Sequence, residues 1–387
     1  MFSKRTGWKL TPNRFTEAER GLRAAGRELL DLTLSNPTRS GLHYDSETIL
    51  QALNNPKAMD YDPQPKGLLI AREAVASYYR KQHDEVNPES LLLTTSTSEG
   101  YSYVFRLLCN PDDEILVPKP SYPLFDFLAD LQDVKLLPYP LIYDHGWQID
   151  FPSLSQAVSD RTRAVVVVHP NNPTGSFVSN AERQKLNEFC RPHNLSLIAD
   201  EVFLDYAHDG APRPSFAANQ DVLTFTLSGL SKISGLPQMK VAWIAASGPA
   251  DKVTAALGRL EIIADTYLSM NAPIQLAMPV LLEQGKSIQP LLLDRLRTNL
   301  AELDRQLTLQ KACQRLQLEG GWYAVLRVPV TQSDEDLAID LLRKVSVLVH
   351  PGHFYDFPSD GYLIASLITP PKDFREGIER VLGRLNP

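Results

Sequence analysis

Strand-like apolar runs alternate with helical patterns between about residues 90 and 250. The runs are SLLLTTS, EILVPKP, AVVVVHP, LSLIADEVF and DVLTFTLSG, and the pattern NAERQKLNEFCRPH between the third and fourth predicts a helix. A second helical pattern, SEGYSYVFRLLC, follows the first run, with Ser98 as its expected N-cap. Near-continuous Val, Ile and Leu strands separated by helices are typical of a mostly parallel sheet covered on both faces.

The pattern changes after residue 249. A long helical stretch is expected from about 249 to 316, and it is followed by strands in GGWYAVLRVPV, SVLVHPG and GYLIASLIT and by helices in SDEDLAIDLLRKV and PPKDFREGIERVLGRLN. This mixture predicts a smaller α+β domain. We therefore expect an α/β protein with an N-terminal segment, 1–45, that packs on the small domain, a large domain, 46–284, with a mostly parallel sheet of the seven-stranded type flanked by helices, and the small α+β domain, 285–387.

Composition narrows the function classes. The 387 residues include 39 basic and 46 acidic side chains, for a net charge of −7, and no dense basic run, which argues against a nucleic-acid partner. The longest apolar runs are far shorter than the roughly 20 residues that span a bilayer, and the N-terminus lacks the apolar core of a signal peptide. Three widely spaced cysteines, Cys109, Cys190 and Cys313, predict neither a disulfide framework nor a metal site, and favour a reduced, cytoplasmic compartment.

Polar residues follow the ends of the predicted strands, where ligands gather in parallel α/β sheets. Thr97 and Ser98, in TTSTS, open a helix whose free N–H groups suit a phosphate, although a plain polar cap explains them as well. Tyr122, in KPSYPLF, is placed to stack on a flat ring, or else is a surface tyrosine. Asn172, in HPNNPTG, either points its amide at a ligand or only shapes a tight turn.

Two further strand ends carry charge. Asp200 closes the apolar run LSLIA, and burying its carboxylate is costly unless a cation or hydrogen-bond donor meets it; a helix-capping aspartate is the alternative. Lys232 lies among small residues in LSGLSKISGLPQMK, where desolvation would lower the pKa of its amine and make it a nucleophile; alone, it reads as a surface lysine. A phosphate cradle, a stacking aromatic, a polar turn, a buried acid and an amine together predict a pyridoxal 5'-phosphate site.

The ordered motifs carry a resemblance to a known family. They are YDPQPKGLLIAREAVASYY, TTSTSEG, PSYPLFD, HPNNPTG, ADEVF, SGLSKISGLPQMK and GGWYAVL. The chain resembles the class I/II pyridoxal-phosphate-dependent aminotransferases of fold type I, the aspartate-aminotransferase-like group, over nearly its whole length. Each motif alone is weak, but the ordered set is specific.

The resemblance implies a role for each candidate residue. Lys232 would form the Schiff base and shuttle the proton between the substrate Cα and the cofactor, Asp200 would keep the ring nitrogen protonated, Asn172 would donate to the ring oxygen, and Tyr122 would stack on the ring. The residues that the resemblance assigns to the phosphate are Thr97, Ser98, Ser231, Lys240 and Tyr61. Because Tyr61 resembles a tyrosine that reaches the neighbouring subunit's cofactor, a homodimer with shared sites is also implied.

Three departures from the family pattern concern the cofactor. Lys240 stands where the family has an arginine that clamps the phosphate, so that end of the cofactor would be held less rigidly. Gly229 replaces a serine and removes a hydroxyl. Phe203 replaces a tyrosine that donates to the ring oxygen, which should raise the pKa of the imine on Lys232.

The fourth departure concerns the substrate. Ile364, in GYLIASLIT, stands where the family has an arginine that grips the substrate α-carboxylate, and an apolar residue cannot take over that role. Arg39, in SNPTRSG, and His353, in HPGHFYDF, are the candidate substitutes; a solvated loop charge and a turn histidine are the alternatives. Ser35 and Asn172 complete the expected substrate-binding set.

The predicted activity is exchange of an amino group between an L-amino acid and a 2-oxo acid, as part of amino acid metabolism. Another reaction on the same cofactor is the first alternative: β-elimination by a C–S lyase, decarboxylation, or transamination of an amine, each favoured by the loss of arginine at Ile364. A non-catalytic, ligand-sensing relative is the second, disfavoured because Lys232 and Asp200 are both present.

Overall fold

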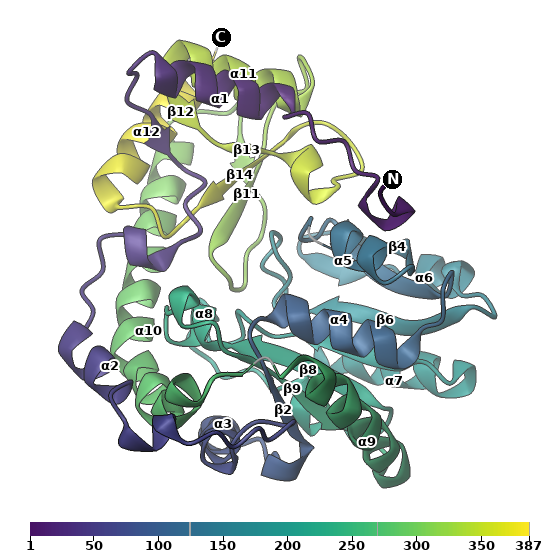
Figure 1. The fold of residues 1–387 in the computed structure, drawn as a ribbon. Coiled ribbons are helices and arrows are strands. Elements are labelled where there is room, and N and C mark those ends of the chain that lie inside the picture. The colour runs from purple at the N-terminus through teal and green to yellow at the C-terminus, as the bar shows by residue number, and fades with distance from the viewer. Residues whose placement is uncertain (124, 269, 387) are drawn as a thin grey trace.

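The computed structural model describes residues 1–123, 125–268 and 270–386. They form a large domain built on one wide sheet and a smaller domain that lies above it in Figure 1. No helix within these three ranges is long and apolar enough to cross a membrane.

The large domain is built around an eight-stranded sheet with the order β2-β9-β8-β7-β6-β3-β4-β5. Its strands are β2 (Leu91–Thr94), β3 (Glu114–Lys119), β4 (Lys135–Tyr143), β5 (Trp147–Ile149), β6 (Thr162–Val168), β7 (Ser196–Asp200), β8 (Thr224–Gly229) and β9 (Ala242–Ser247). The five neighbours from β8 to β4 are parallel, whereas β9 is antiparallel to β8 and β2, and β5 is antiparallel to β4. The mostly parallel sheet is confirmed, but the expectation of seven strands was wrong by one, because β5 folds back onto the edge of β4.

Helices cover both faces of this sheet, as its uninterrupted apolar strands require. One face carries α4 (Thr97–Leu108), α5 (Phe125–Leu131) and α9 (Ala250–Tyr267). The other carries α2 (Ser46–Ala52), α3 (Leu69–Lys81), α6 (Phe151–Ala157), α7 (Asn180–His193) and the first turns of α10 (Ala272–Leu307). Helix α7 begins and ends where its sequence pattern predicts, because Ser179 and Glu182 form a reciprocal capping box at its start.

The small domain has a four-stranded antiparallel sheet with the order β10-β11-β14-β13. Its strands are β10 (Gln314–Arg315), β11 (Tyr323–Arg327), β13 (His350–Pro351) and β14 (Tyr362–Ser366), and its helices are α11 (Asp334–Val345) and α12 (Pro371–Leu385). The N-terminal part of the chain adds α1 (Arg14–Ala24), which packs on α11, and β1 (Leu30–Asp31), which pairs in parallel with β12 (Val347–Leu348). Figure 1 shows α1 and α11 side by side at the top of the molecule.

Helix α10 runs along one side of both domains in Figure 1, from the large sheet to the small one. The expected division between residues 284 and 285 falls within this helix. The expectation of one helical stretch from 249 to 316 was wrong, because α9 ends at Tyr267, Leu268 takes a left-handed conformation (φ 48°), and Asn271 caps a new helix by accepting from the Ile274 N–H. An asparagine with a proline two residues later, Pro273, is a helix-start signal that could have been recognised in the sequence.

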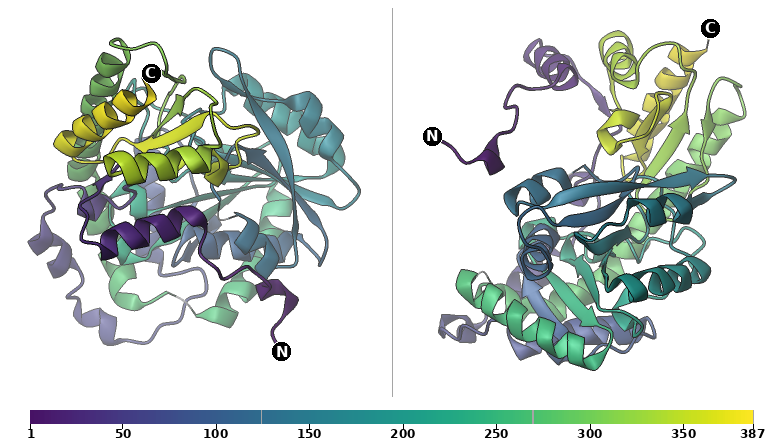
Figure 2. Two further views of the ribbon diagram at one scale, coloured as in Figure 1. Left: turned by 90° about the horizontal axis from the view of Figure 1, so that it is seen from above. Right: turned by 90° about the vertical axis from the view of Figure 1, so that its right-hand side faces the viewer.

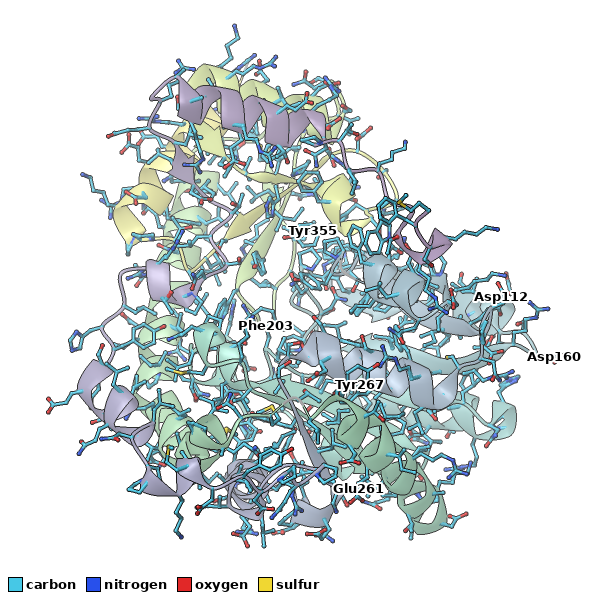
Figure 3. The ribbon with its side chains drawn as sticks, in the orientation of Figure 1. Asp112, Asp160, Phe203, Glu261, Tyr267 and Tyr355 are labelled. Carbon is cyan, nitrogen blue, oxygen red and sulfur yellow. The ribbon has the colours of Figure 1, made fainter. Side chains whose placement is uncertain are left out.

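The two domains also touch on the side away from α10. The Lys119 ammonium, at the end of β3, lies 2.9 Å from the Asp356 carboxylate, and the Ser121 N–H donates to the Tyr355 carbonyl oxygen (3.0 Å). Figure 3 shows Tyr355 and Phe203 labelled at this junction. The N-terminal segment crosses the same junction, because the Trp8 indole donates to Asp130 on α5 (2.7 Å) while α1 stays on the small domain; Figure 2 shows this segment reaching down from α1.

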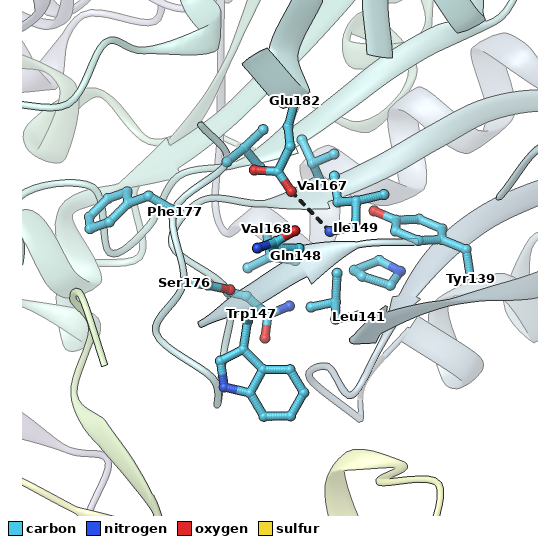
Figure 4. Close-up of a pocket in the computed structure, with 13 residues that line it drawn as sticks. Tyr139, Leu141, Trp147, Gln148, Ile149, Val167, Val168, Ser176, Phe177 and Glu182 are labelled. Carbon is cyan, nitrogen blue, oxygen red and sulfur yellow. Dashed lines mark hydrogen bonds between the residues drawn. The ribbon is translucent and has the colours of Figure 1, made fainter. Parts of the chain in front are cut away.

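A small cavity lies under the turn that follows β6 (Figure 4). Residues from β4, β5 and the segment 176–178 line it, and the Ile149 N–H donates to Glu182 beside it (2.9 Å). Neither Lys232 nor Asp200 contributes to this cavity, which is mostly apolar, so it belongs to the packing of β5 on α7.

Candidate active site

Lys232 lies in the short helix α8 (Leu230–Ile233), which begins directly after β8 near the junction of the two domains. Its ammonium is 4.6 Å from the centre of the Trp322 ring and 5.4 Å from that of Phe203, and it donates weakly to the Ser35 carbonyl oxygen (3.4 Å). The Tyr206 hydroxyl donates to the Lys232 carbonyl oxygen (2.6 Å) and so holds the backbone of α8 in place. The amine of the predicted lysine therefore lies close to two aromatic rings.

Burial lowers the pKa of the Lys232 amine to about 8, because the charged form loses water contact, and the negative charge of Asp200 opposes this shift. No carboxylate within the described ranges pairs directly with the amine, which keeps its lone pair accessible. An amine that is about half deprotonated at pH 8 and mostly neutral above it is suited to attack a carbonyl carbon.

Asp200 closes β7 and is only 9% exposed. The Tyr101 hydroxyl donates to its Oδ2 (3.0 Å) and the Val202 N–H to its Oδ1 (3.2 Å). Burial raises the pKa of this carboxyl to about 6, although both donors lower it. Asp200 therefore turns into its own loop and does not cap a helix, and it is an anion at neutral pH that can accept a further donor.

Asn172 lies in the turn after β6, and its side chain is 9% exposed. Its Oδ1 atom has no hydrogen-bond partner in the part of the chain that the structure describes. Gly175, in the same turn, has φ 69°, and a Cβ there would lie 2.3 Å from the Gly320 carbonyl oxygen. The turn therefore packs tightly against residues 318–321. It holds the Asn172 side-chain amide in a buried position where that amide can form a further hydrogen bond.

Two of the phosphate candidates, Thr97 and Ser98, lie at the start of α4. Ser96, and not Ser98, is the N-cap, because its side chain accepts from the Glu99 N–H (3.1 Å); the expected cap at Ser98 was wrong by two residues. The N–H groups of Thr97 and Ser98 fall in the first turn, where a helix carries orphan donors and the positive end of its dipole. This is the ordinary place for a phosphate in an α/β protein.

Two further phosphate candidates, Ser231 and Lys240, lie in α8 and in the turn that precedes β9. Ser231 is partly buried, and Lys240 is exposed and left-handed, with φ 54°. Gly229 is extended, but a Cβ at that position would lie 2.8 Å from the Val241 carbonyl oxygen and 2.9 Å from the Ala242 Cβ. A serine at 229 would force β9 away from β8, so this departure from the family pattern follows from the closer approach of the two strands.

The substrate candidates are not all in one place. The Ser35 carbonyl oxygen accepts from the Lys232 amine. Tyr122, the candidate for stacking on the cofactor ring, is 42% exposed and lies at the domain junction beside Ser121. Arg39 is exposed in the 3₁₀ turn Pro37–Arg39, four residues after Ser35. His353 is also exposed, with its ring 4.7 Å from that of Phe354.

Two candidates lie apart from Lys232. Ile364 is fully buried in the core of the small domain, where it pairs across the sheet with Val325 and His350. Tyr61 is 82% exposed in a groove between residues 58–65 and 264–275. Tyr101 and Trp322 were not predicted as site residues. For Tyr101 the available signal was its spacing of four from Thr97, which puts both residues on one face of α4.

The residues present fit pyridoxal phosphate. A buried anionic carboxyl with room for one more donor and a desolvated amine are each left without the partner that the ring nitrogen and the aldehyde carbon would supply, and the buried Asn172 side chain carries an amide Nδ2 that can donate to the ring oxygen. In the described ranges, no group of three His, Cys, Asp or Glu side chains is placed to hold a metal ion. Fold and site together define a cofactor-dependent group-transfer enzyme.

Comparison with known proteins identifies the family. Residues 27–380 match the family described as aminotransferase class I and II. The chain is 30% identical to a glutamate–pyruvate aminotransferase of Haemophilus influenzae over 89% of this chain and 88% of that one, and 29% identical to an S-alkyl-thiohydroximate lyase of Arabidopsis thaliana over 62% and 52%. A crystal structure of an aminotransferase from Escherichia coli superposes with a TM-score of 0.87 at 25% identity, over 100% of this chain and 98% of that one.

The chain therefore belongs to the class I and II aminotransferase family. It has the aspartate-aminotransferase-like fold and is an amino-acid aminotransferase, an enzyme that transfers nitrogenous groups. Membership in the family implies pyridoxal phosphate as the cofactor.

Proposed function

We propose that this enzyme moves an amino group between an L-amino acid and a 2-oxo acid through pyridoxal phosphate bound covalently to Lys232. The observation that carries the proposal is the desolvated Lys232 amine, over the rings of Trp322 and Phe203 and within electrostatic reach of buried Asp200. Pyridoxal phosphate, when bound, supplies an aldehyde that takes up amino groups and a ring that accepts electrons.

Each remaining residue would have one task. The Asp200 carboxylate would accept a hydrogen bond from the protonated ring nitrogen, Asn172 would donate to the ring oxygen, and Tyr122 would cover one ring face. The amine of Lys232, once released by the incoming amino group, would take the proton from the substrate Cα and return it one position away. At the other end, the phosphate would be held by Thr97 N–H, Ser98 N–H, Ser231 and Lys240.

The substrate carboxylate needs a partner other than residue 364, because Ile364 is sealed in the core. We assign this role to Arg39, whose 3₁₀ turn continues the segment that touches the Lys232 amine through Ser35. An exposed guanidinium that can form a two-pronged bond with a carboxylate is the group this task requires. His353, at the exposed edge of the small domain, would act as a second donor.

The buried Ile364 also favours a second candidate function. If no arginine grips a carboxylate, the same cofactor chemistry suits an amine or a thioether, and elimination at a C–S bond is the leading form of it. The similarity to a lyase that acts on an S-alkyl-thiohydroximate gives this alternative support from a relative.

We also propose a homodimer in which Tyr61 reaches the cofactor phosphate of the partner. Met59 and Tyr61 are 89% and 82% exposed, and Leu268 across the same groove is 54% exposed, so a second copy would cover three large apolar side chains. Mixing a Tyr61→Ala variant with a Lys232→Ala variant tests the shared site. If Tyr61 acts across the interface, mixed dimers contain one site with both residues intact and recover activity; if it acts within its own chain, the mixture stays inactive.

The first experiment records the visible absorption of the purified enzyme before and after single L-amino acids are added. A cofactor band that bleaches, with release of the matching 2-oxo acid, supports transamination and identifies the donor. A band that responds only to amines or thioethers supports the second candidate.

The residue-level test is Lys232→Ala. We expect loss of turnover with an unchanged fold, whereas Lys185→Ala, which removes an exposed lysine on α7, should retain the wild-type rate. Turnover near the wild-type rate in Lys232→Ala contradicts the proposal.

A further inference from the structure

Helix α4 connects both ends of the proposed cofactor site. Thr97, in its first turn, lies at the phosphate end, and Tyr101, one turn later on the same face, donates its hydroxyl to Asp200 Oδ2 (3.0 Å). Because a helix turn is rigid, the spacing between the phosphate donors and the residue that bonds Asp200 is set by a single element, α4.

Tyr101 is itself held in place. Its side chain is 3% exposed, and the rings of Phe125 and Phe105 meet its ring edge-on at centroid distances of 5.2 and 5.8 Å. A phenol packed on two sides loses little further freedom when it forms a hydrogen bond. Its hydroxyl is therefore a fixed donor that points at one oxygen of the buried carboxylate.

The two oxygens of Asp200 each receive one donor from the protein. Tyr101 donates to Oδ2 and the Val202 N–H to Oδ1, which fixes the plane of the carboxylate and leaves one lone pair on each oxygen unused. The titratable groups that face Asp200 are Tyr101 from α4, Lys232 from α8 and Tyr122 from the loop after β3. Of these, Tyr101 is the one that donates a hydrogen bond to it within the described residues.

We propose that Tyr101 is a positioning residue whose hydroxyl keeps Asp200 ionised and aims its free lone pair at the protonated ring nitrogen of pyridoxal phosphate. The inference rests on the proposed function, since it needs the cofactor to lie between α4 and Lys232. The physical reason is that a hydrogen bond donated to a carboxylate stabilises the charged form, in a site where burial favours the neutral one.

The sign of the pH effect follows from this. Burial raises the pKa of Asp200 to about 6, and the Tyr101 hydrogen bond opposes that shift. The affinity for the cofactor should therefore fall as the pH drops through about 6, because a protonated Asp200 no longer pairs with the ring nitrogen. Without the Tyr101 hydroxyl the pKa of the Asp200 carboxyl should rise, and the loss of cofactor affinity should begin at a higher pH.

The test compares holoenzymes of the wild type, Tyr101→Phe and Tyr139→Phe. Each is equilibrated against decreasing cofactor concentrations at pH values on both sides of 6, and bound cofactor is read from its absorption. Tyr139→Phe is the matched control, because its hydroxyl is also buried but donates to the Val166 carbonyl oxygen (2.7 Å). Both variants lose one buried hydroxyl, so both should lose stability, but only one should change the titration.

We expect the midpoint of the pH dependence in Tyr101→Phe to move upward by about one pH unit, a tenfold effect typical of a hydrogen bond to a charged group. Tyr139→Phe should keep the wild-type midpoint, and Asp200→Asn should have none. If Tyr101→Phe folds poorly, Tyr101→His, which retains a ring N–H donor, should move the midpoint upward by less than about one pH unit.

The outcomes separate the two claims. A wild-type midpoint in Tyr101→Phe, or an equal shift in Tyr139→Phe, overturns the role of Tyr101 while the cofactor band remains. A wild-type enzyme that binds no cofactor overturns the proposed function, and this inference with it.

Discussion

Removing the Lys232 amine should abolish a specific pH dependence of stability in the cofactor-free protein. The amine has a pKa of about 8 in the folded chain, against 10.5 for an ordinary lysine. The cause is burial beside the rings of Trp322 and Phe203, which removes water from the charged form. A difference of this size corresponds to about 3 kcal/mol between the two protonation states, and residual water contact makes this an upper value.

The direction follows from proton counting. Between pH 8 and 10.5 the unfolded chain keeps a proton on Lys232 that the folded chain has released, so the free energy of unfolding must rise with pH across this window. Below pH 8 both states are protonated, and the folded state carries the full cost of burying the charge. We expect the wild type to gain up to about 3 kcal/mol across the window.

The assay is urea unfolding of cofactor-free wild type and Lys232→Met at pH values from 7 to above 10.5, with the difference between the two curves taken at each pH. Lys185→Met is the control, since this exposed lysine should leave the wild-type slope unchanged. If wild type and Lys232→Met show the same slope between pH 8 and 10.5, the amine is not desolvated, and the argument for its reactivity fails.

Three further substitutions have defined outcomes. Glu201→Gln should stabilise the protein relative to wild type as the pH rises towards 8, because burial raises the Glu201 pKa to about 8 and the amide does not titrate; equal pH slopes in urea unfolding would contradict this. Phe203→Tyr places a hydroxyl beside the Lys232 amine and should move the pH midpoint of the holoenzyme absorption band downward; an unmoved midpoint means that the hydroxyl does not reach the cofactor oxygen. Ile364→Arg should cost about 3 kcal/mol or more of unfolding free energy, against about 1 for Ile364→Val; an arginine accepted without loss would show that position 364 opens towards the site.

The sequence was most informative where one local signal determines the structure. Helix α7 was predicted to the residue because the capping serine, the glutamate three positions later and the apolar spacing agree. The strands that end at Asp200 and precede Lys232 were also predicted, because buried parallel strands read as uninterrupted apolar runs, but the runs 195–203 and 221–229 extend up to three residues beyond β7 and β8.

Features that depend on contacts distant in sequence were not predictable in this way. Tyr101 reads as one aromatic in an amphipathic helix, and only the fold brings it to Asp200, 99 positions further along the chain. Gly229 reads as a lost serine until the close approach of Val241 is known. The eighth strand, β5, is three residues long, and its pairing with β4 comes from the turn between them and not from any periodicity.

Helix α10 has a mechanical consequence. Its 36 residues make a rod of roughly 54 Å that is bonded to the large domain at one end and to the small domain at the other, for instance through the Asn299 amide, which donates to the carbonyl oxygens of Leu367 and Thr369. The rod therefore couples the positions of the two domains. Away from it, the domains are also joined by the Lys119–Asp356 ion pair, by the Trp8–Asp130 hydrogen bond and by backbone hydrogen bonds of Ser121, Gly320 and Gly321. Partly exposed ion pairs contribute about 1 kcal/mol or less and weaken in salt, so the Lys119–Asp356 pair adds only a small and ionic-strength-dependent part of this connection.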